Sequence, residues 1–180
     1  MVVFVSGCGY FVTRRTEMIK SFAPVIDENT RILILGTMPG VASLLANEYY
    51  GHKQNAFWKI MSLCFNNGRE WVDYAEKIRC LRAHGVGLWD NLKSCCRKGS
   101  LDSDIKSPEP NDIAGLLQKY PGVKKILFNG RKSYEFFKKY HAPLLEICET
   151  EIMPSTSPAN ATISREEKYR QWSRALGCCR

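Results

Sequence analysis

The sequence predicts an α/β domain of three layers, in which helices cover both faces of a central, mostly parallel, four-stranded sheet. Three observations lead to this fold class. Short, continuously apolar segments recur along the chain, polar turns follow them, and segments with helical spacing of apolar residues lie between them. Continuous apolar strands are typical of a sheet that is buried on both faces. Strands that alternate with helices favour right-handed crossovers and therefore parallel pairing.

The predicted elements follow one another in a regular order. Strands are expected at residues 31–36, 85–89, 123–128 and 150–153. The first strand is closed by a glycine, the second is followed by Asp90-Asn91, and the third by Asn129-Gly130. Helices are expected at residues 55–66, 70–83 and 165–176. Two further helices are expected to run from a cap at Asn111 or Asp112 to Tyr120, and from Gly130 toward Tyr140. A polar loop is expected between the second strand and the helix that ends at Tyr120.

The chain is predicted to form one domain. Residues 1–24 are interpreted as a loosely attached N-terminal extension, and residues 25–180 as the domain. The first residues lack the pattern of a signal peptide, and no apolar run approaches the roughly 20 residues that span a bilayer. Eight cysteines occur without a CxxC motif, which favours reduced thiols over a metal site. We expect an intracellular protein, in the cytoplasm or a nucleus, without membrane contact, metal or other cofactor.

The charge of the chain indicates the kind of partner. Lys and Arg total 26 against 18 Asp and Glu, which gives a net charge of +8 and a sequence pI near 9.1. A small basic domain suits a polyanion, because fixed positive charge releases counterions from a phosphate backbone. A soluble protein that is merely cationic is the alternative.

The polar turns after the strands predict a single crevice, because ligands of open α/β sheets bind beyond the carboxyl ends of the strands. The turns lie at residues 36–40, 90–91, 129–130 and 154–160. The residues expected to line the crevice carry amides and hydroxyls, with one carboxylate, and are Thr37, Asn55, Asn129, Ser155, Thr156, Ser157, Asn160 and Asp90. Such a lining suits a polar planar ligand and an oriented water. The chain lacks a Walker A loop, a GxGxxG fingerprint and a GxSxG elbow, which argues against a nucleotide cofactor and a serine hydrolase.

Aromatic residues beside Asn55 offer flat surfaces for a nucleobase. Tyr49, Tyr50 and His52 lie in a predicted loop, where a stacking role is expected. Trp58 is expected in the core.

Two long motifs resemble one known family. They are LGTMPG at residues 35–40, with YYGHKQNAFW at 49–58, and PSTSPAN at 154–160, while LWD, GSLDS and FNG lie between them in the expected order. On these motifs the chain resembles the uracil-DNA glycosylase superfamily, and most closely its hypoxanthine-DNA glycosylase branch. The resemblance covers about residues 22–176.

The resemblance implies a monofunctional DNA glycosylase that flips a deaminated base, most simply hypoxanthine, out of double-stranded or single-stranded DNA and leaves an abasic site. Met38 stands where uracil-removing relatives carry a carboxylate or asparagine, and a thioether cannot orient a water. The resemblance instead assigns the catalytic role to Asn55, with support from Asn129. We expect the base-binding pocket to consist of Gly36, Thr37, Met38, Tyr50, His52, Phe57 and Asp90. We expect DNA contacts from Pro154, Ser155, Thr156, Ser157, Pro158, Ala159, Asn160 and Arg165.

Other interpretations stay open at the level of sequence. Asn55 can be a helix cap, Asn129 a turn residue, and Asp90 a cap or a water-activating base. Asp102 and Asp104 are interpreted as residues that order their loop. The basic residues of the last helix can be a solvated face or a phosphate contact. The alternative functions are a mismatch-specific uracil or thymine glycosylase and a non-catalytic reader of unusual bases. We expect a monomer.

Overall fold

A computed structural model describes residues 18–178 of the chain. Its central sheet contains the four predicted strands, β2 (Ile32–Gly36), β3 (Val86–Asp90), β6 (Lys125–Asn129) and β7 (Glu149–Met153). Their order across the sheet is β3-β2-β6-β7, and every neighbouring pair is parallel. The predicted fold class is therefore confirmed, and all four strands point their carboxyl ends toward the same edge of the sheet.

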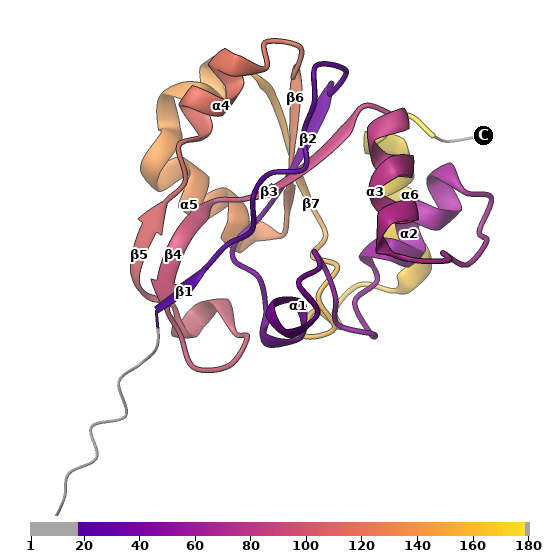
Figure 1. Cartoon of the computed structure of the whole chain (residues 1–180), viewed down its shortest axis with the longest axis horizontal. Helices are drawn as coiled ribbons and strands as arrows, with labels where there is room; N and C mark the ends of the chain where they lie inside the picture. The colour runs from indigo at the N-terminus through magenta and orange to yellow at the C-terminus, as the bar shows by residue number, and fades with distance from the viewer. Residues whose placement is uncertain (1–17, 179–180) are drawn as a thin grey trace, which may run out of the picture.

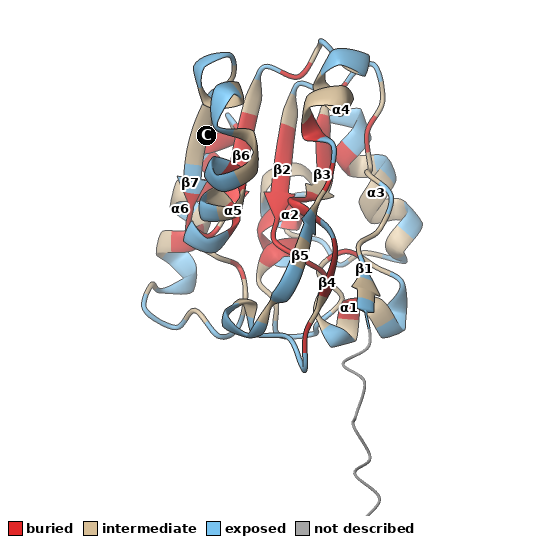
Figure 2. Ribbon diagram, turned by 90° about the vertical axis from the view of Figure 1, so that its left-hand side faces the viewer, coloured by how far each residue is buried: buried red, intermediate tan, exposed pale blue. Residues whose placement is uncertain are grey.

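Two groups of helices cover the two faces of this sheet (Figure 1). The helices α2 (Phe57–Phe65), α3 (Tyr74–Ala83) and α6 (Arg165–Ala175) lie on one face, and α4 (Ile113–Lys119) and α5 (Arg131–His141) on the other. Strand side chains alternate between the faces, so Ile34 packs in one core cluster while Leu33 and Leu35 pack in the other. Both faces of β2 are buried (Figure 2), which explains why the strand is apolar without interruption.

Side-chain caps fix where three of these helices begin. Asp73, Asp112 and Ser164 accept hydrogen bonds from backbone N–H groups three residues later, at 2.6, 2.9 and 3.1 Å. These bonds satisfy donors that have no partner inside the helix. The predicted cap at Asp112 is thus the one that the chain uses.

A second, antiparallel sheet was not predicted. It has the order β1-β4-β5 and consists of β1 (Met18–Lys20), β4 (Leu92–Cys96) and β5 (Lys106–Pro110). The polar loop expected after β3 is therefore a hairpin. The prediction was wrong there because β4 mixes apolar and polar residues and β5 contains two prolines. Prolines are tolerated on a sheet edge, where β5 lies with most residues exposed (Figure 2). The short helix α1 (Val41–Ala46) was also not predicted.

The described part of the N-terminal segment belongs to the domain. Besides the pairing of β1 with β4, Trp89 donates from Nε1 to the carbonyl of Phe22 at 3.2 Å, and the Tyr49 hydroxyl donates to the carbonyl of Ala23 at 3.2 Å. Residues 18–23 of the expected extension therefore contact the rest of the chain, mainly through backbone groups that leave no apolar pattern in the sequence. Residues 1–17 of the expected extension lie outside the described residues.

Residues 18–178 contain no helix whose length and apolar character would carry it across a bilayer.

Candidate active site

A cavity of about 510 Å³ opens at the carboxyl ends of the four parallel strands. Gly36 ends β2, Asp90 ends β3, Asn129 ends β6, and residues 155–160 follow β7, and all of them line it. The crevice predicted from the turns is therefore present. The predicted site residues that line it are Gly36, Thr37, Met38, Tyr50, His52, Asn55, Asp90, Asn129, Ser155, Thr156, Ser157, Pro158, Ala159 and Asn160.

Three predicted residues lie elsewhere. Phe57 was expected in the base-binding pocket, but its side chain is fully buried in the core and does not line the cavity. Its ring stacks under Tyr50 with 3.8 Å between centroids and 21° between planes, so it supports a lining residue from below. Pro154 is buried, and its carbonyl accepts a hydrogen bond from Trp172 Nε1 at 3.0 Å. Arg165 begins α6, outside the cavity.

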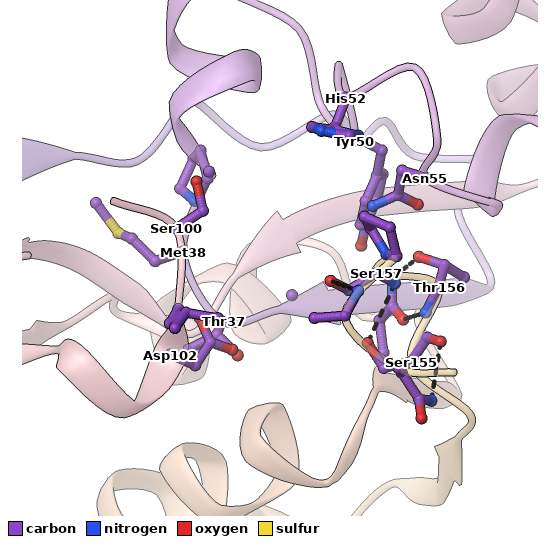
Figure 3. A pocket seen from close by; sticks show the side chains of 18 of the residues that line it. Thr37, Met38, Tyr50, His52, Asn55, Ser100, Asp102, Ser155, Thr156 and Ser157 are labelled. Atoms are coloured by element: carbon purple, nitrogen blue, oxygen red, sulfur yellow. Dashed lines mark hydrogen bonds between the residues drawn. The ribbon is translucent and has the colours of Figure 1, made fainter. Parts of the chain in front are cut away.

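The labelled lining residues form two groups (Figure 3). We call Gly36, Thr37, Asp90 and Asp102 the acidic wall. We call Asn129, Ser155, Thr156, Ser157 and Asn160 the amide wall. Tyr50, His52 and Asn55 lie together next to the labelled residues of the amide wall.

The amide wall is internally hydrogen-bonded. Asn129 donates from Nδ2 to Thr156 Oγ1 at 2.9 Å and accepts the Thr156 backbone N–H at 2.9 Å. Asn129 also forms a hydrogen bond with the Tyr50 side chain. Asn160 donates to the Ser155 carbonyl at 3.2 Å, and its own carbonyl accepts from Lys168 at 2.6 Å. Most polar groups of this wall therefore already have protein partners.

Asn55 lies where the two sequence motifs meet. Its Oδ1 accepts the Phe57 backbone N–H at 3.0 Å, so the helix-cap interpretation is correct in part. The next residue, Ala56, donates its N–H to the Thr156 carbonyl at 3.0 Å, which ties this segment to the amide wall. The Asn55 Nδ2 group forms no hydrogen bond with residues 18–178, and it faces the cavity region (Figure 3). An amide with unused donors beside a cavity is suited to bind a ligand or a water.

Asp90 is the carboxyl group of the acidic wall. It is only 4% exposed, and within the described residues its Oδ2 atom is buried without a hydrogen-bond partner. Burial, and to a smaller extent nearby Asp102, raise the pKa of Asp90 to about 8 against the opposing effect of Arg97. The group is therefore largely neutral at pH 7.

Residues that sequence reasoning assigned to a loop complete the acidic wall. The guanidinium of Arg97, a buried residue, contacts the carbonyl of Pro39 and lies 3.3 Å from Asp102 Oδ1. Ser100, Leu101 and Asp102 also line the cavity. The GSLDS motif was the available signal, but the spacing of its residues along the chain did not reveal that they lie against the turn after β2.

The turn after β2 is held by buried side chains. Asn91 donates from Nδ2 to the Gly36 carbonyl at 2.9 Å, and the Ser133 hydroxyl donates to the Leu35 carbonyl at 2.7 Å. A Cβ on Gly36 would lie 2.4 Å from Asp90 Oδ1 and 3.6 Å from the Tyr50 hydroxyl oxygen. Glycine is therefore required at position 36, because the Asp90 carboxyl occupies the space of a side chain.

The basic residues of α6 are partly neutralised. Arg170 contacts Glu167 through two hydrogen bonds of 2.8 and 2.7 Å, and Arg174 lies 3.7 Å from Glu151. Arg165 forms no ion pair with residues 18–178. Lys168 pairs with no carboxylate of the described chain either, but it is buried and donates to the Asn160 carbonyl, so Arg165 is the exposed cation of this helix that is open to a phosphate.

The composition of the lining restricts the chemistry of the site. No lysine or cysteine of the described chain lines the cavity, and among residues 18–178 no group of three or more His, Cys, Asp or Glu side chains could hold a metal. The arrangement can bind a planar polar ligand, orient a water and supply a neutral carboxyl group.

Comparison with known proteins finds relatives that all belong to one superfamily. The profile of the uracil DNA glycosylase superfamily matches residues 23–176. The chain is 37% identical over 159 residues to a hypoxanthine DNA glycosylase of Methanosarcina barkeri, across 87% of this chain and 97% of that protein. It is 39% identical over 151 residues to a hypoxanthine DNA glycosylase of Methanosarcina acetivorans, across 83% of this chain and 92% of that protein.

A solved structure agrees with these relatives. The chain matches the solution NMR structure of a candidate uracil DNA glycosylase from Methanosarcina acetivorans with a TM-score of 0.74 and 35% identity, across 89% of this chain and 99% of that one. A profile match over the domain, full-length relatives and a shared fold all agree with the resemblance noted in the two motifs. The chain belongs to the uracil DNA glycosylase superfamily.

Proposed function

We propose that the protein is a hydrolytic DNA glycosylase that releases hypoxanthine from deoxyinosine in DNA and leaves an abasic site. The observation that carries the proposal is the cavity in which both family motifs meet, with an unused asparagine amide on its rim. Two full-length relatives described as hypoxanthine DNA glycosylases support the choice of base. The protein is proposed to act as a monomer.

The base enters the cavity after it leaves the stack. Extrusion of a mispaired base costs least, which contributes to selectivity. The Tyr50 ring, backed by Phe57, offers an aromatic surface against which the base can stack. Asn129 acts mainly as a positioning residue, because its amide is engaged by Thr156 and Tyr50.

Asn55 holds the attacking water. Its Oδ1 keeps one lone pair beyond the bond from Phe57, and its Nδ2 carries two donors, so the amide can bind a water in either orientation. That water adds to the anomeric carbon as the sugar becomes cationic. Met38 lines the cavity but offers no group for this task. Since no lysine of the described residues lines the cavity, no amine is placed to attack the sugar, and the product strand stays unbroken.

Residues 155–160 contact the DNA around the flipped nucleotide. Pro158 and Ala159 are exposed and so can enter the gap that the base leaves, and the hydroxyls of Ser155 and Ser157 can bind phosphate. Arg165, next along the chain, is the proposed cationic phosphate contact.

The test is a single-turnover assay on labelled DNA with one deoxyinosine, in duplex and single-stranded form, beside matched strands with one uracil. Strand breaks that require alkali, from deoxyinosine faster than from uracil, are expected. Release from uracil alone would favour the activity named for a relative from Schizosaccharomyces pombe, a G/U mismatch-specific uracil DNA glycosylase, 31% identical over 110 residues. Binding without release from either strand would favour a non-catalytic reader.

A further inference from the structure

We propose that Asp90 is a catalytic acid that donates a proton to the departing base, and that it makes the site selective for purines that carry an acceptor at N7. The inference deepens the proposed function and rests on it, since it assigns the role of one residue toward the base. It goes beyond the water-orienting chemistry of Asn55, which acts on the other side of the bond that breaks.

The position of Asp90 points to the base rather than to the protein. The residue ends β3, lines the cavity and is only 4% exposed. Its Oδ1 lies 2.4 Å from the place where a Cβ on Gly36 would stand, directly over the turn that follows β2. Its Oδ2 is buried and has no hydrogen-bond partner in the described chain. A buried polar atom without a partner is costly, so a ligand that completes its hydrogen bonding is favoured.

Burial and a second carboxyl group oppose the ionisation of Asp90. Asp102 belongs to the same wall and raises the pKa of Asp90, and Tyr49, Tyr50 and Tyr74 beside it have raised pKa values, so they stay neutral and supply no positive charge. Arg97 is the cation that acts on Asp90, but its guanidinium contacts Asp102 and the Pro39 carbonyl. With this environment, burial raises the pKa of Asp90 to about 8.

A neutral carboxyl group is a donor, which decides between the two roles open to Asp90. A general base toward water must be ionised at the working pH, whereas a neutral acid can donate a hydrogen bond or a proton. At pH 7 the neutral form dominates, so the acid role fits the cavity and the base role does not.

Asp90 supplies the proton that the departing base takes up. The bond between C1′ and N9 breaks, and its electron pair goes to the imidazole ring of hypoxanthine. The Asp90 proton moves to N7 of the base, so the base leaves neutral rather than as an anion. Water forms the new bond to C1′ and loses one proton, which restores the Asp90 carboxyl group through solvent. The products are hypoxanthine and an abasic deoxyribose.

The chemistry of the leaving group gives the selectivity. Hypoxanthine presents N7 and O6 acceptors on the same edge as guanine does. A pyrimidine such as uracil has no N7, so it gains nothing from a proton donor placed for that atom. Asp90 thereby contributes to base choice at the chemical step, beyond the shape of the pocket.

The first experiment removes the acceptor and the donor in turn. Wild type and Asp90→Asn, which keeps the shape of the side chain, are compared by single-turnover release from deoxyinosine and 7-deaza-deoxyinosine duplexes. On deoxyinosine the rate of base release by the variant is expected to be about 100-fold lower than that of wild type, as for removal of a general acid. On the 7-deaza substrate the two proteins are expected to react at the same rate, because the acceptor is absent. An equal loss on both substrates, or none on deoxyinosine, would overturn the proposal.

The second experiment needs no substrate analogue, so it decides the question even where 7-deaza release is too slow to measure. The wild-type rate on deoxyinosine is expected to fall as pH rises through about 8, because deprotonation removes the acid, and this fall is expected to vanish in Asp90→Asn. Asp102→Asn removes a negative charge beside Asp90. It is therefore expected to lower the pKa of Asp90 and to move the fall in rate to lower pH. A rate that rises to a plateau with pH would instead identify a base.

The controls separate this inference from the proposed function. Thermal melting of each variant shows whether it is folded. If wild type releases no hypoxanthine at any pH, the proposed function fails. If wild type releases hypoxanthine while Asp90→Asn matches it at every pH, the proposed function stands and the role of Asp90 fails.

Discussion

The two walls of the cavity use their polar groups in opposite ways. The amide wall joins Asn129 to Thr156 by two hydrogen bonds of 2.9 Å and ties Asn160 to Lys168. The acidic wall leaves Asp90 Oδ2 buried without a partner in the described chain. The difference separates two kinds of polar group. Groups that are already hydrogen-bonded to the protein hold the shape of the site, whereas groups without protein partners are available to bind the substrate.

Asn55 tests this difference most directly, because its Oδ1 accepts a hydrogen bond from the Phe57 N–H while its Nδ2 has no partner among residues 18–178. Asn55→Ala removes both the cap on Phe57 and the unused Nδ2, and we expect release from deoxyinosine to fall by about 100-fold or more, as for loss of a group that acts in the transition state. Single-turnover rates at saturating enzyme measure the effect, and DNA affinity is expected to stay unchanged.

Asn55→Asp is the matched control, since it keeps an oxygen on the Phe57 N–H. It is expected to retain the stability that the cap contributes, about 1 kcal/mol, while losing the amide donors. Full activity in Asn55→Ala would remove Asn55 from the mechanism and leave it as a cap.

Gly36→Ala tests how tightly the acidic wall is built. Its Cβ would stand 2.4 Å from Asp90 Oδ1, so we expect a loss of about 1–3 kcal/mol in the free energy of unfolding and a strong loss of release. Denaturant titration measures the stability. Asp90→Ala in the same chain is expected to restore part of the stability but none of the activity, and strictly additive effects would argue against the close approach.

Thr156→Val tests the amide wall. The change removes the Oγ1 acceptor and leaves Asn129 Nδ2 with fewer partners in a buried site, so the free energy of unfolding is expected to fall by about 1–3 kcal/mol. Release is expected to slow less than in Asn55→Ala, because positioning is affected and no reacting group is lost. Thr156→Ser keeps a hydroxyl and serves as control. A larger loss of rate than in Asn55→Ala would reverse the roles of the two walls.

Arg165→Gln is expected to have the smallest effect, on binding alone. If Arg165 contacts one phosphate, the slope of log affinity against log salt falls by about 0.9 for duplex DNA. Arg170→Gln is the matched control, because its guanidinium is engaged by Glu167 and its loss is expected to leave the slope unchanged. Equal slopes in both variants and wild type would place this end of α6 away from the DNA.

Sequence reasoning predicted the central sheet well and the second sheet not at all. The strands β2, β3 and β6 are mostly buried and apolar, so their burial is visible in the sequence. The fourth strand, β7, carries two glutamates, and only its last residue, Met153, is buried. In the second sheet β4 lies between β1 and β5, and its buried residues include polar Ser94, so they form no continuous apolar run. The edge strand β5 contains Pro108 and Pro110, so no apolar pattern marks it either.

The site shows the same division. The polar turns were predictable, because parallel strands deliver their carboxyl ends to one edge. Phe57 was misplaced because an aromatic residue beside a motif does not reveal which way its ring points, and it lies beneath Tyr50. The pairing of Arg97 with Asp102, and the approach of Asp90 to Gly36, depend on contacts between separate turns. Such contacts require the tertiary structure.

The most direct test of the central claim follows the oxygen atom. A deoxyinosine duplex is incubated with the protein in water enriched in ¹⁸O, and the products are identified by mass spectrometry. The account predicts free hypoxanthine together with an unbroken strand whose abasic sugar carries one ¹⁸O atom. An intact deoxyinosine strand, or a strand cleaved without alkali, would contradict hydrolytic release of the base.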